Sequence, residues 1–234
     1  MSDFFEIFNP GLRHTREQRD REKMLIVEAD RGGAGPEPLD LDSGSVVLRL
    51  PPRAYPEPMQ TPPAPEPDDK DWTFVLERPC PECGYDARSV AVGELPARVR
   101  AATAPWQQVL TLPGVRTRPA PRVWSPLEYA CHVRDVLRVF TGRVALIRGE
   151  DNPRFPNWDQ DATAREDRYD QQDPAVVATE LADAAEANAA AWAGVPETDW
   201  SRPGTRSNGS AFTLDTLGRY QLHDLVHHLH DVGV

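Results

Sequence analysis

The histidines of this chain gather near its C-terminal end in a pattern that could bind a metal. Four of the six lie within residues 223–230, and another is His132. His223 and His227 are four residues apart, so on a helix they lie one turn apart on the same face. His132 follows the helical spacing of the apolar residues around it, which places it on a buried side. Three neutral imidazoles would bind Zn²⁺ or Ni²⁺ and leave positions open for water or substrate. We therefore predict a metal site made of His132, His223 and His227.

His228 and His230 are expected to face the solvent or to act around the ligands. A single histidine on an apolar face is more often a hydrogen-bonded core residue than a ligand. The prediction therefore depends on the three histidines together and not on any one of them.

Four other residues are candidates for supporting the ligands or lining a pocket. Asp135 lies one turn after His132, and Asp224 directly follows the first histidine of the pair. Either carboxylate could accept the free ring N–H of a ligand, although a surface position is as reasonable for Asp224. Tyr220 lies on the face of the histidine pair. Trp158 lies in a long connection, where it could form a substrate wall or a local anchor.

A second, weaker metal site is predicted at Cys80 and Cys83. The segment Cys80-Pro-Glu-Cys-Gly84 has the proline and glycine of a tight turn whose amides face two thiolates. Zinc ribbons use this turn in pairs, and the sequence has no second pair. Three interpretations remain open, namely a half-site completed by a histidine or carboxylate, a redox pair, and a reduced structural turn.

Composition restricts the class of protein. The formal net charge is -11, which disfavours a nucleic-acid partner because an acidic surface repels phosphates. No apolar run approaches the roughly 18 residues of a membrane span, and the N-terminus has no signal-peptide pattern. Three cysteines do not form a disulfide framework. We expect a cytoplasmic protein without a membrane partner.

The distribution of proline predicts three regions. Residues 1–50 are expected to form a small, partly disordered N-terminal unit of unknown function. Residues 51–75 are rich in proline and acidic residues, which is typical of an extended, solvated linker. Residues 76–234 are expected to form a metal-binding helical bundle.

This last region has an all-α pattern. The second helix has Ser125 as its cap and proline at its first position, the third has Asp173 as its cap, and the fourth has Thr213. Two connections are long, and residues 207–209 could close a small hairpin within the second. The expected helices cover residues 95–112, 126–149, 174–193 and 214–232, which predicts a four-helix bundle.

Two segments carry a resemblance to a known family. Trp124–Asp135 and His223–His228 resemble the DinB-like superfamily, which includes S-transferases that use bacillithiol or mycothiol. The resemblance covers about residues 80–232. It implies an up-down-down-up four-helix bundle with one histidine on the second helix and a His-x-x-x-His pair on the fourth. These positions correspond to His132, His223 and His227.

Two connecting segments narrow the resemblance. Residues 155–161 and 206–213 are similar to an actinobacterial-type subgroup of the superfamily. Residues 8–50 more weakly resemble a small uncharacterised domain.

The residues and the resemblance lead to one functional expectation and one alternative. We expect a divalent-metal-dependent enzyme, either a thiol S-transferase of the mycothiol type or a hydrolase, acting on a small electrophile. Its cofactor would be zinc or nickel, and a low-molecular-weight thiol such as mycothiol would be a cosubstrate. The alternative is a non-catalytic, metal-stabilised module for stress-related interactions. A homodimer is compatible with the resemblance.

Overall fold

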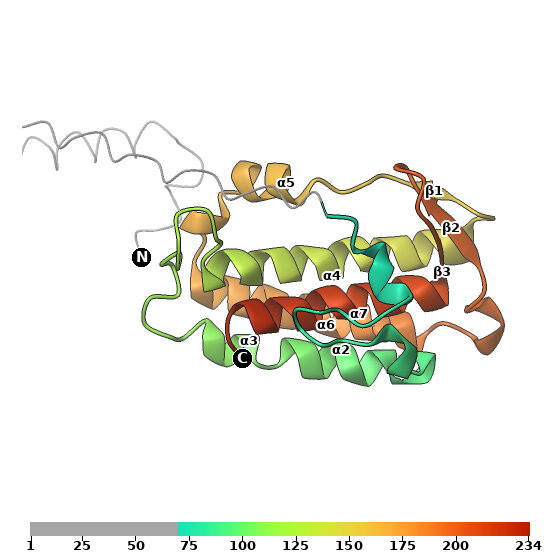
Figure 1. The fold of residues 1–234 in the computed structure, drawn as a ribbon, viewed down its shortest axis with the longest axis horizontal. Coiled ribbons are helices and arrows are strands. Elements are labelled where there is room, and N and C mark those ends of the chain that lie inside the picture. Colours follow the sequence, from blue (N-terminus) through green and yellow to red (C-terminus); the bar gives the residue numbers. More distant parts are fainter. Residues whose placement is uncertain (1–69) are drawn as a thin grey trace, which may run out of the picture. The chain divides into compact units, whose positions relative to one another are not determined.

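The computed structural model describes residues 70–234. Four helical segments form a bundle with a small sheet at one end (Figure 1). The predicted N-terminal unit of residues 1–50, and residues 51–69 of the predicted linker, lie outside the described residues. No helix within residues 70–234 has the length and hydropathy needed to cross a membrane.

The bundle helices begin and end close to the positions that the sequence predicts, with one exception. The segment expected as a single helix over 95–112 is divided into two, because Pro105 has no N–H to continue the helical hydrogen bonds. The predictions for the second, third and fourth helices are confirmed. The bundle is formed by α2 (Leu95–Thr103) with α3 (Trp106–Val109), α4 (Pro126–Gly149), α6 (Pro174–Ala193) and α7 (Leu214–Asp231).

Helix caps explain the starts of α4 and α7. The Ser125 hydroxyl accepts from the Glu128 backbone N–H, and the Glu128 carboxylate accepts from the Ser125 backbone N–H. Thr213 and Thr216 form the same reciprocal pair at the start of α7. Each pair satisfies backbone donors that have no partner within a helix end.

The helix directions follow the up-down-down-up order. In Figure 1, α2 and α7 run in one direction, while α4 and α6 both run in the other. Because α4 and α6 are parallel, the chain between them must return along the whole bundle. The short helix α5 (Gln160–Glu166) lies on this return path. This confirms the predicted DinB-like bundle.

A three-stranded sheet closes one end of the bundle. Strand β1 (Arg154–Phe155) pairs in parallel with β2 (Pro203–Arg206), and β2 pairs antiparallel with β3 (Ala211–Thr213). The predicted hairpin is confirmed, and its turn has Gly209 at φ 98°. The sheet holds the two long connections together.

Short 3₁₀ helices make up most of the remaining ordered turns. They are η2 (Trp72–Leu76), η3 (Ala87–Ser89), η4 (Val92–Glu94), η5 (Tyr169–Gln171) and η6 (Glu197–Asp199). Helix η2 begins within the region that the sequence assigns to the linker. Its Val75 is fully buried, and the Trp72 ring lies 5.2 Å from the His223 ring on α7. Apolar packing on α7 therefore begins before residue 76.

Two helix glycines give opposite predictions for stability. Gly142 is exposed on α4 with open space around a built Cβ, whereas a Cβ on Gly218 of α7 would lie 2.4 Å from Leu95 Cδ1. We expect Gly142→Ala to raise the free energy of unfolding by about 0.5–1 kcal/mol. We expect Gly218→Ala to lower it by about 1 kcal/mol, because overpacking outweighs the gain in helix propensity. Urea unfolding of both variants measures this, and a stabilised Gly218→Ala would contradict the close packing of α2 and α7.

Candidate metal centre

Helix α7 presents two potential ligand pairs on neighbouring faces. His223 and His227 form one pair, and Asp224 and His228 form the other. Consecutive residues on a helix differ by about 100° in direction, so pairs offset by one residue point to different surroundings. The first pair faces the segment around Cys80, and the second faces α4.

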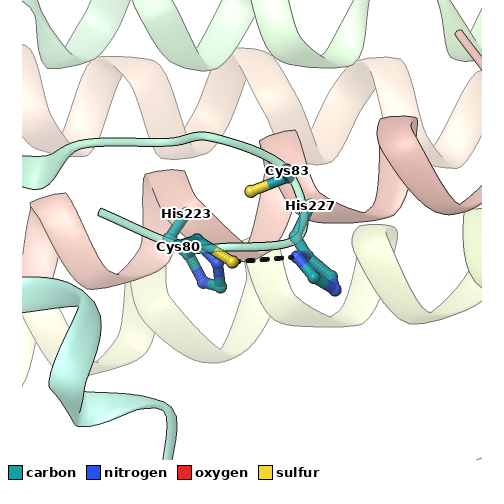
Figure 2. Close-up of side chains that lie close together, drawn as sticks. All are labelled: Cys80, Cys83, His223 and His227. Carbon is teal, nitrogen blue, oxygen red and sulfur yellow. Dashed lines mark hydrogen bonds between the residues drawn. The ribbon is translucent and has the colours of Figure 1, made fainter. Parts of the chain in front are cut away.

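The first group consists of Cys80, Cys83, His223 and His227 (Figure 2). Their candidate ligand atoms all lie within 4.8 Å of one another. Cys80 Sγ lies 3.8 Å from His227 Nδ1. Cys80, His223 and His227 are buried, and Cys83 is partly buried. The sequence did not identify the partners of the cysteine pair, because they lie about 140 residues further along the chain.

A tight turn sets the positions of the two cysteines. The Cys80 backbone N–H donates to the Tyr85 carbonyl at 2.8 Å, and the Gly84 N–H donates to the Cys80 carbonyl at 3.0 Å. Gly84 has φ 74°, a left-handed conformation that favours glycine. The Tyr85 hydroxyl donates to the Arg219 carbonyl at 2.8 Å, which ties this turn to α7.

The thiols of Cys83 and Cys131 are not activated. Burial raises the pKa of Cys83 to about 11 and that of Cys131 to about 12. Both are therefore neutral thiols near neutral pH when no metal is bound. The attacking thiol of a redox pair needs a lowered pKa, so Cys83 does not fit that role.

The second group consists of His132, Asp224 and His228. His132 Nε2 lies 3.4 Å from Asp224 Oδ1, and His228 Nε2 lies 3.6 Å from the same oxygen. His132 is fully buried on α4, and its ring lies 4.7 Å from the His228 ring. Two imidazoles and one carboxylate thus converge where α4 and α7 face each other.

Several candidate ligand atoms of both groups are buried and form no hydrogen bond within residues 70–234. They are both ring nitrogens of His132, Nε2 of His223 and Oδ1 of Asp224. An unpaired buried polar atom costs about 1–3 kcal/mol. A metal ion in each group would satisfy one nitrogen of His132, Nε2 of His223 and the Asp224 oxygen, whereas the N–H nitrogen of His132 would keep no partner.

The protonation states also suit metal binding. Burial lowers the pKa of His132, and burial together with the neighbouring His227 lowers the pKa of His223 to about 4. Burial likewise lowers the pKa of His227. All three imidazoles are therefore neutral near pH 7, which leaves a ring nitrogen free to coordinate.

Asp231 orients a histidine of each group. Its Oδ2 lies 2.8 Å from His228 Nδ1, and its Oδ1 lies 3.7 Å from His227 Nε2. The short contact assigns the Nδ1 proton to His228, which leaves Nε2, 3.6 Å from Asp224 Oδ1, as its candidate ligand atom. A carboxylate in this position is the usual support of a metal-bound histidine.

The structure separates the three histidines that the sequence analysis grouped. His223 and His227 lie with the cysteines, while His132 lies with Asp224 and His228. His228, which was expected to face the solvent or to act around the ligands, stands among the candidate ligands instead. The physical reason is the rotation of α7, which spacing alone does not determine. The set of His132, His223 and His227 stays a prediction.

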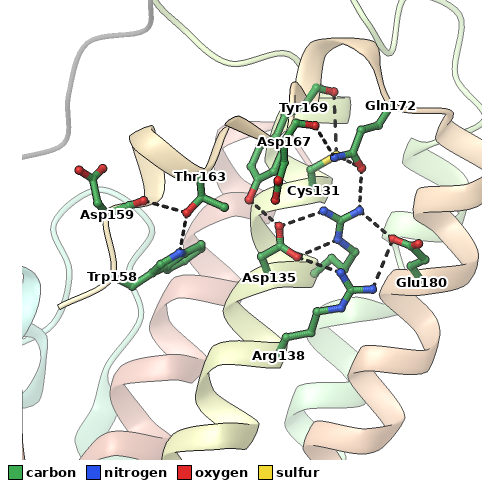
Figure 3. Close-up of polar contacts among 11 residues, drawn as sticks. Cys131, Asp135, Arg138, Trp158, Asp159, Thr163, Asp167, Tyr169, Gln172 and Glu180 are labelled. Carbon is green, nitrogen blue, oxygen red and sulfur yellow. Dashed lines mark hydrogen bonds and ion pairs between the residues drawn. The ribbon is translucent and has the colours of Figure 1, made fainter. Parts of the chain in front are cut away.

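Asp135 does not support His132 as the sequence analysis expected. Its carboxylate pairs with the Arg134 guanidinium through two hydrogen bonds of 2.9 Å and accepts from the Tyr169 hydroxyl at 2.6 Å (Figure 3). Arg134 also donates to Gln172 and Glu180. This network fastens the return connection between α4 and α6 to the bundle.

Trp158 and Tyr220 line a cleft of about 750 Å³ beside both groups. The Trp158 ring stacks on His132 with ring centroids 5.3 Å apart and an interplanar angle of 10°. Its indole N–H donates to the Thr163 hydroxyl at 2.8 Å, which holds it in place. His223, Asp224, His227 and His228 also line this cleft. A substrate-binding role for Trp158 and Tyr220 stays a prediction.

Two arginines of the cleft were not identified from the sequence. Arg143 is 8% exposed, and its nearest polar contact is the Pro156 carbonyl at 3.2 Å. Arg206 donates to Asn208, Ser210 and Tyr220. Neither guanidinium forms an ion pair with a carboxylate among residues 70–234. Burial and the like charge of Arg206 lower the pKa of Arg143 to about 10. Only the fold brings these arginines together, one from α4 and one from β2.

Comparison with known proteins identifies the family. Residues 96–232 match the family model described as the DinB superfamily. The matched residues make up more than half of the chain. The chain therefore belongs to the DinB superfamily. Residues 7–48 match a second model, a family of unknown function named DUF6191.

More distant comparisons add little. No curated protein matches the chain. One similar solved structure is YfiT from Bacillus subtilis, described as a probable metal-dependent hydrolase with an unusual four-helix bundle topology. It is 19% identical with a TM-score of 0.48, over 68% of this chain and 81% of that chain. A likeness of this degree carries no argument about the present chain.

The Asp135 network gives a prediction for pH-dependent stability. Burial alone would raise the pKa of Asp135, but hydrogen bonds from Arg134 and Tyr169 outweigh it and hold the pKa below its ordinary value of 3.8. The network therefore stabilises the fold above that pH, and the contribution is lost as pH falls through the lower folded pKa. We expect Asp135→Asn to lower the free energy of unfolding near neutral pH by about 3 kcal/mol. The difference from wild type should shrink below about pH 4.

Urea unfolding across this pH range measures the effect. Asp170→Asn is the control, because Asp170 is exposed in the connection between α4 and α6 that the network fastens. Its effect on the free energy of unfolding should stay within about 0.5 kcal/mol. An Asp135 variant with a constant deficit down to the lowest pH would show that the carboxylate charge does not stabilise the network.

Proposed function

We propose that this protein is a divalent-metal-dependent enzyme that acts on a small molecule in the cleft, with its metal held by His132, Asp224 and His228. The observation that carries the proposal is the approach of two imidazoles to one carboxylate oxygen beside the cleft, with His132 Nε2 at 3.4 Å and His228 Nε2 at 3.6 Å from Asp224 Oδ1. Membership of the DinB superfamily supports it. The set of His132, His223 and His227 remains the alternative ligand set.

The composition of the set favours catalysis over a structural role. Two imidazoles and one carboxylate are three protein ligands, and catalytic zinc sites keep a further position for water or substrate. The non-catalytic alternative requires a sealed site with a fourth protein ligand. Asp224 and His228 instead border the cleft, which has room for a small substrate. Imidazole and carboxylate donors are compatible with zinc or nickel.

The proposed reaction is attack by water or by a low-molecular-weight thiol, such as mycothiol, on a small electrophile. A bound divalent ion would lower the pKa of that nucleophile and stabilise negative charge on the substrate. Asp231 holds the His228 ring in the tautomer that directs Nε2 toward Asp224. The Trp158 ring covers His132 and excludes water from one side of it.

The two cleft arginines define the class of substrate further. A buried guanidinium without a carboxylate partner is unfavourable until an anion arrives. Arg143 is such a residue, and Arg206 adds a second positive charge on the same cleft. We therefore propose that the substrate, or the thiol that attacks it, has a carboxylate or a similar negative group.

The metal assignment predicts a loss of metal in one variant of α4. His132→Ala should remove one equivalent of divalent metal, because it deletes the buried ligand of the cleft group. Its helical circular dichroism should stay unchanged. His230→Ala is the control, since it removes an exposed histidine of α7 that belongs to neither group. Metal content by inductively coupled plasma mass spectrometry measures this, and full metal content in His132→Ala would refute the assignment.

The arginine pair predicts a selectivity for anionic substrates. In a panel of paired esters and electrophiles with and without a carboxylate, wild type should prefer the charged member. Arg206→Gln should reduce that preference in kcat/KM about tenfold, the value of one hydrogen bond to a charged group. Arg154→Gln on the exposed side of the same sheet is the control. An equal preference for the charged member in wild type and Arg206→Gln would refute the proposed anionic subsite.

A further inference from the structure

We infer that Cys80, Cys83, His223 and His227 form a second metal site, a closed structural zinc site that fastens the turn at residues 80–84 to α7. It is separate from the cleft metal proposed above and does not depend on it. The half-site that Cys80 and Cys83 form is completed by the two histidines of α7.

The positions of the donors are close to those of a bound site. A tetrahedral zinc ion with sulfur and nitrogen ligands places its donor atoms about 3.3–3.8 Å apart. Cys80 Sγ and His227 Nδ1 lie 3.8 Å apart, and no pair in the group exceeds 4.8 Å. Rotations of the side chains would close the remaining gaps, while the backbone turn and α7 stay in place.

The donor chemistry selects zinc. Two thiolates and two imidazoles form the tetrahedral set of many structural zinc sites, and soft sulfur ligands disfavour magnesium or calcium. Binding would release one proton from each thiol to the solvent. Nothing is oxidised or reduced in this step.

The surrounding carboxylates hold the ring of His227 in the required tautomer. Its Nδ1 faces Cys80, while its Nε2 lies 3.5 Å from Glu82 Oε2 and 3.7 Å from Asp231 Oδ1. A proton on Nε2 toward these carboxylates leaves the Nδ1 lone pair for the metal.

His223 supplies an independent observation. It is 3% exposed, and its Nε2 has no hydrogen-bond partner among residues 70–234. The Trp72 ring at 5.2 Å and the Tyr85 ring at 5.6 Å pack around it, and neither offers an acceptor to this atom. A metal ion would satisfy this nitrogen.

The site has a structural character because its four ligands leave no open position. Its two histidines border the cleft, whereas its two cysteines do not. The ordered turns between residues 70 and 94 are short 3₁₀ helices, which contribute little stability alone. A metal link to α7 would hold this segment against the bundle.

Cobalt substitution of the full-length protein tests the inference. Co²⁺ added to chelator-treated protein should give a thiolate-to-cobalt charge-transfer absorption in the near ultraviolet. Cys83→Ser should lose this absorption and one equivalent of metal, and its Tm in zinc should fall by about 5–10 °C. Cys131→Ser removes a cysteine outside the group and is the control, which should keep the absorption and the metal. His132→Ala should keep the absorption even though it loses the cleft metal.

A measurement on the unmutated chain covers the case in which Cys83→Ser does not fold. Zinc should protect Cys80 and Cys83 from iodoacetamide, read by peptide mass spectrometry, and a chelator should remove the protection of Cys83. The inference is overturned if cobalt binds without a thiolate absorption, or if zinc leaves the alkylation of Cys83 unchanged. Failure of the cleft proposal has a different signature, namely metal loss in Cys83→Ser together with full metal retention in His132→Ala.

Discussion

The rotation of α7 about its own axis is the constraint on which both candidate sites depend. Leu214, Leu217, Leu222 and Leu225 point into the core and are essentially fully buried. A series of buried side-chain hydrogen bonds further restricts how α7 packs. The Trp192 indole donates to Gln221 at 2.8 Å, and the Gln221 amide donates to Asn188 at 2.9 Å. Since buried polar groups must be paired, this series restricts the rotation of α7 more strictly than leucine packing alone.

With α7 set in this way, one helix serves two chemically different groups. The group with Cys80 and Cys83 would neutralise a divalent ion with two thiolates, and its ligands are all protein atoms. The group with His132 provides a single carboxylate, so a divalent ion there would keep positive charge beside the cleft. Arg143 and Arg206 line the same cleft, together with the carboxylates of Asp71, Asp159 and Asp161. Asp231 contacts a histidine of each group, which gives the two groups a common support.

The sequence was sufficient for elements whose signals are local. Ser125, Asp173 and Thr213 as caps predicted the starts of three helices, and Gly209 predicted the hairpin turn, because capping and turn chemistry act within a few residues. The break of the first helix at Pro105 is also a local effect, because proline has no backbone N–H. The apolar pattern of the expected helix over 95–112 did not reveal this break. The docking of Val75 on the bundle depends on distant residues, so the composition of its own segment gave no sign of it.

The grouping of ligands could not be predicted in the same way. His223-Asp224 and His227-His228 are adjacent polar pairs, so either member could face α4 at the cost of a rotation of about 100°. Asp135 has the right spacing from His132, but its neighbour Arg134 binds the carboxylate instead. Residue types and helix positions are properties of the sequence, whereas the choice among adjacent faces is a property of the packed bundle.

The central claim is that α7 carries two separate metal sites. Anomalous diffraction from a crystal of the zinc-loaded protein, recorded at the zinc absorption edge, tests it most directly. The account predicts one peak among Cys80, Cys83, His223 and His227 and a second peak among His132, Asp224 and His228. A single peak bound jointly by His132, His223 and His227 would contradict it.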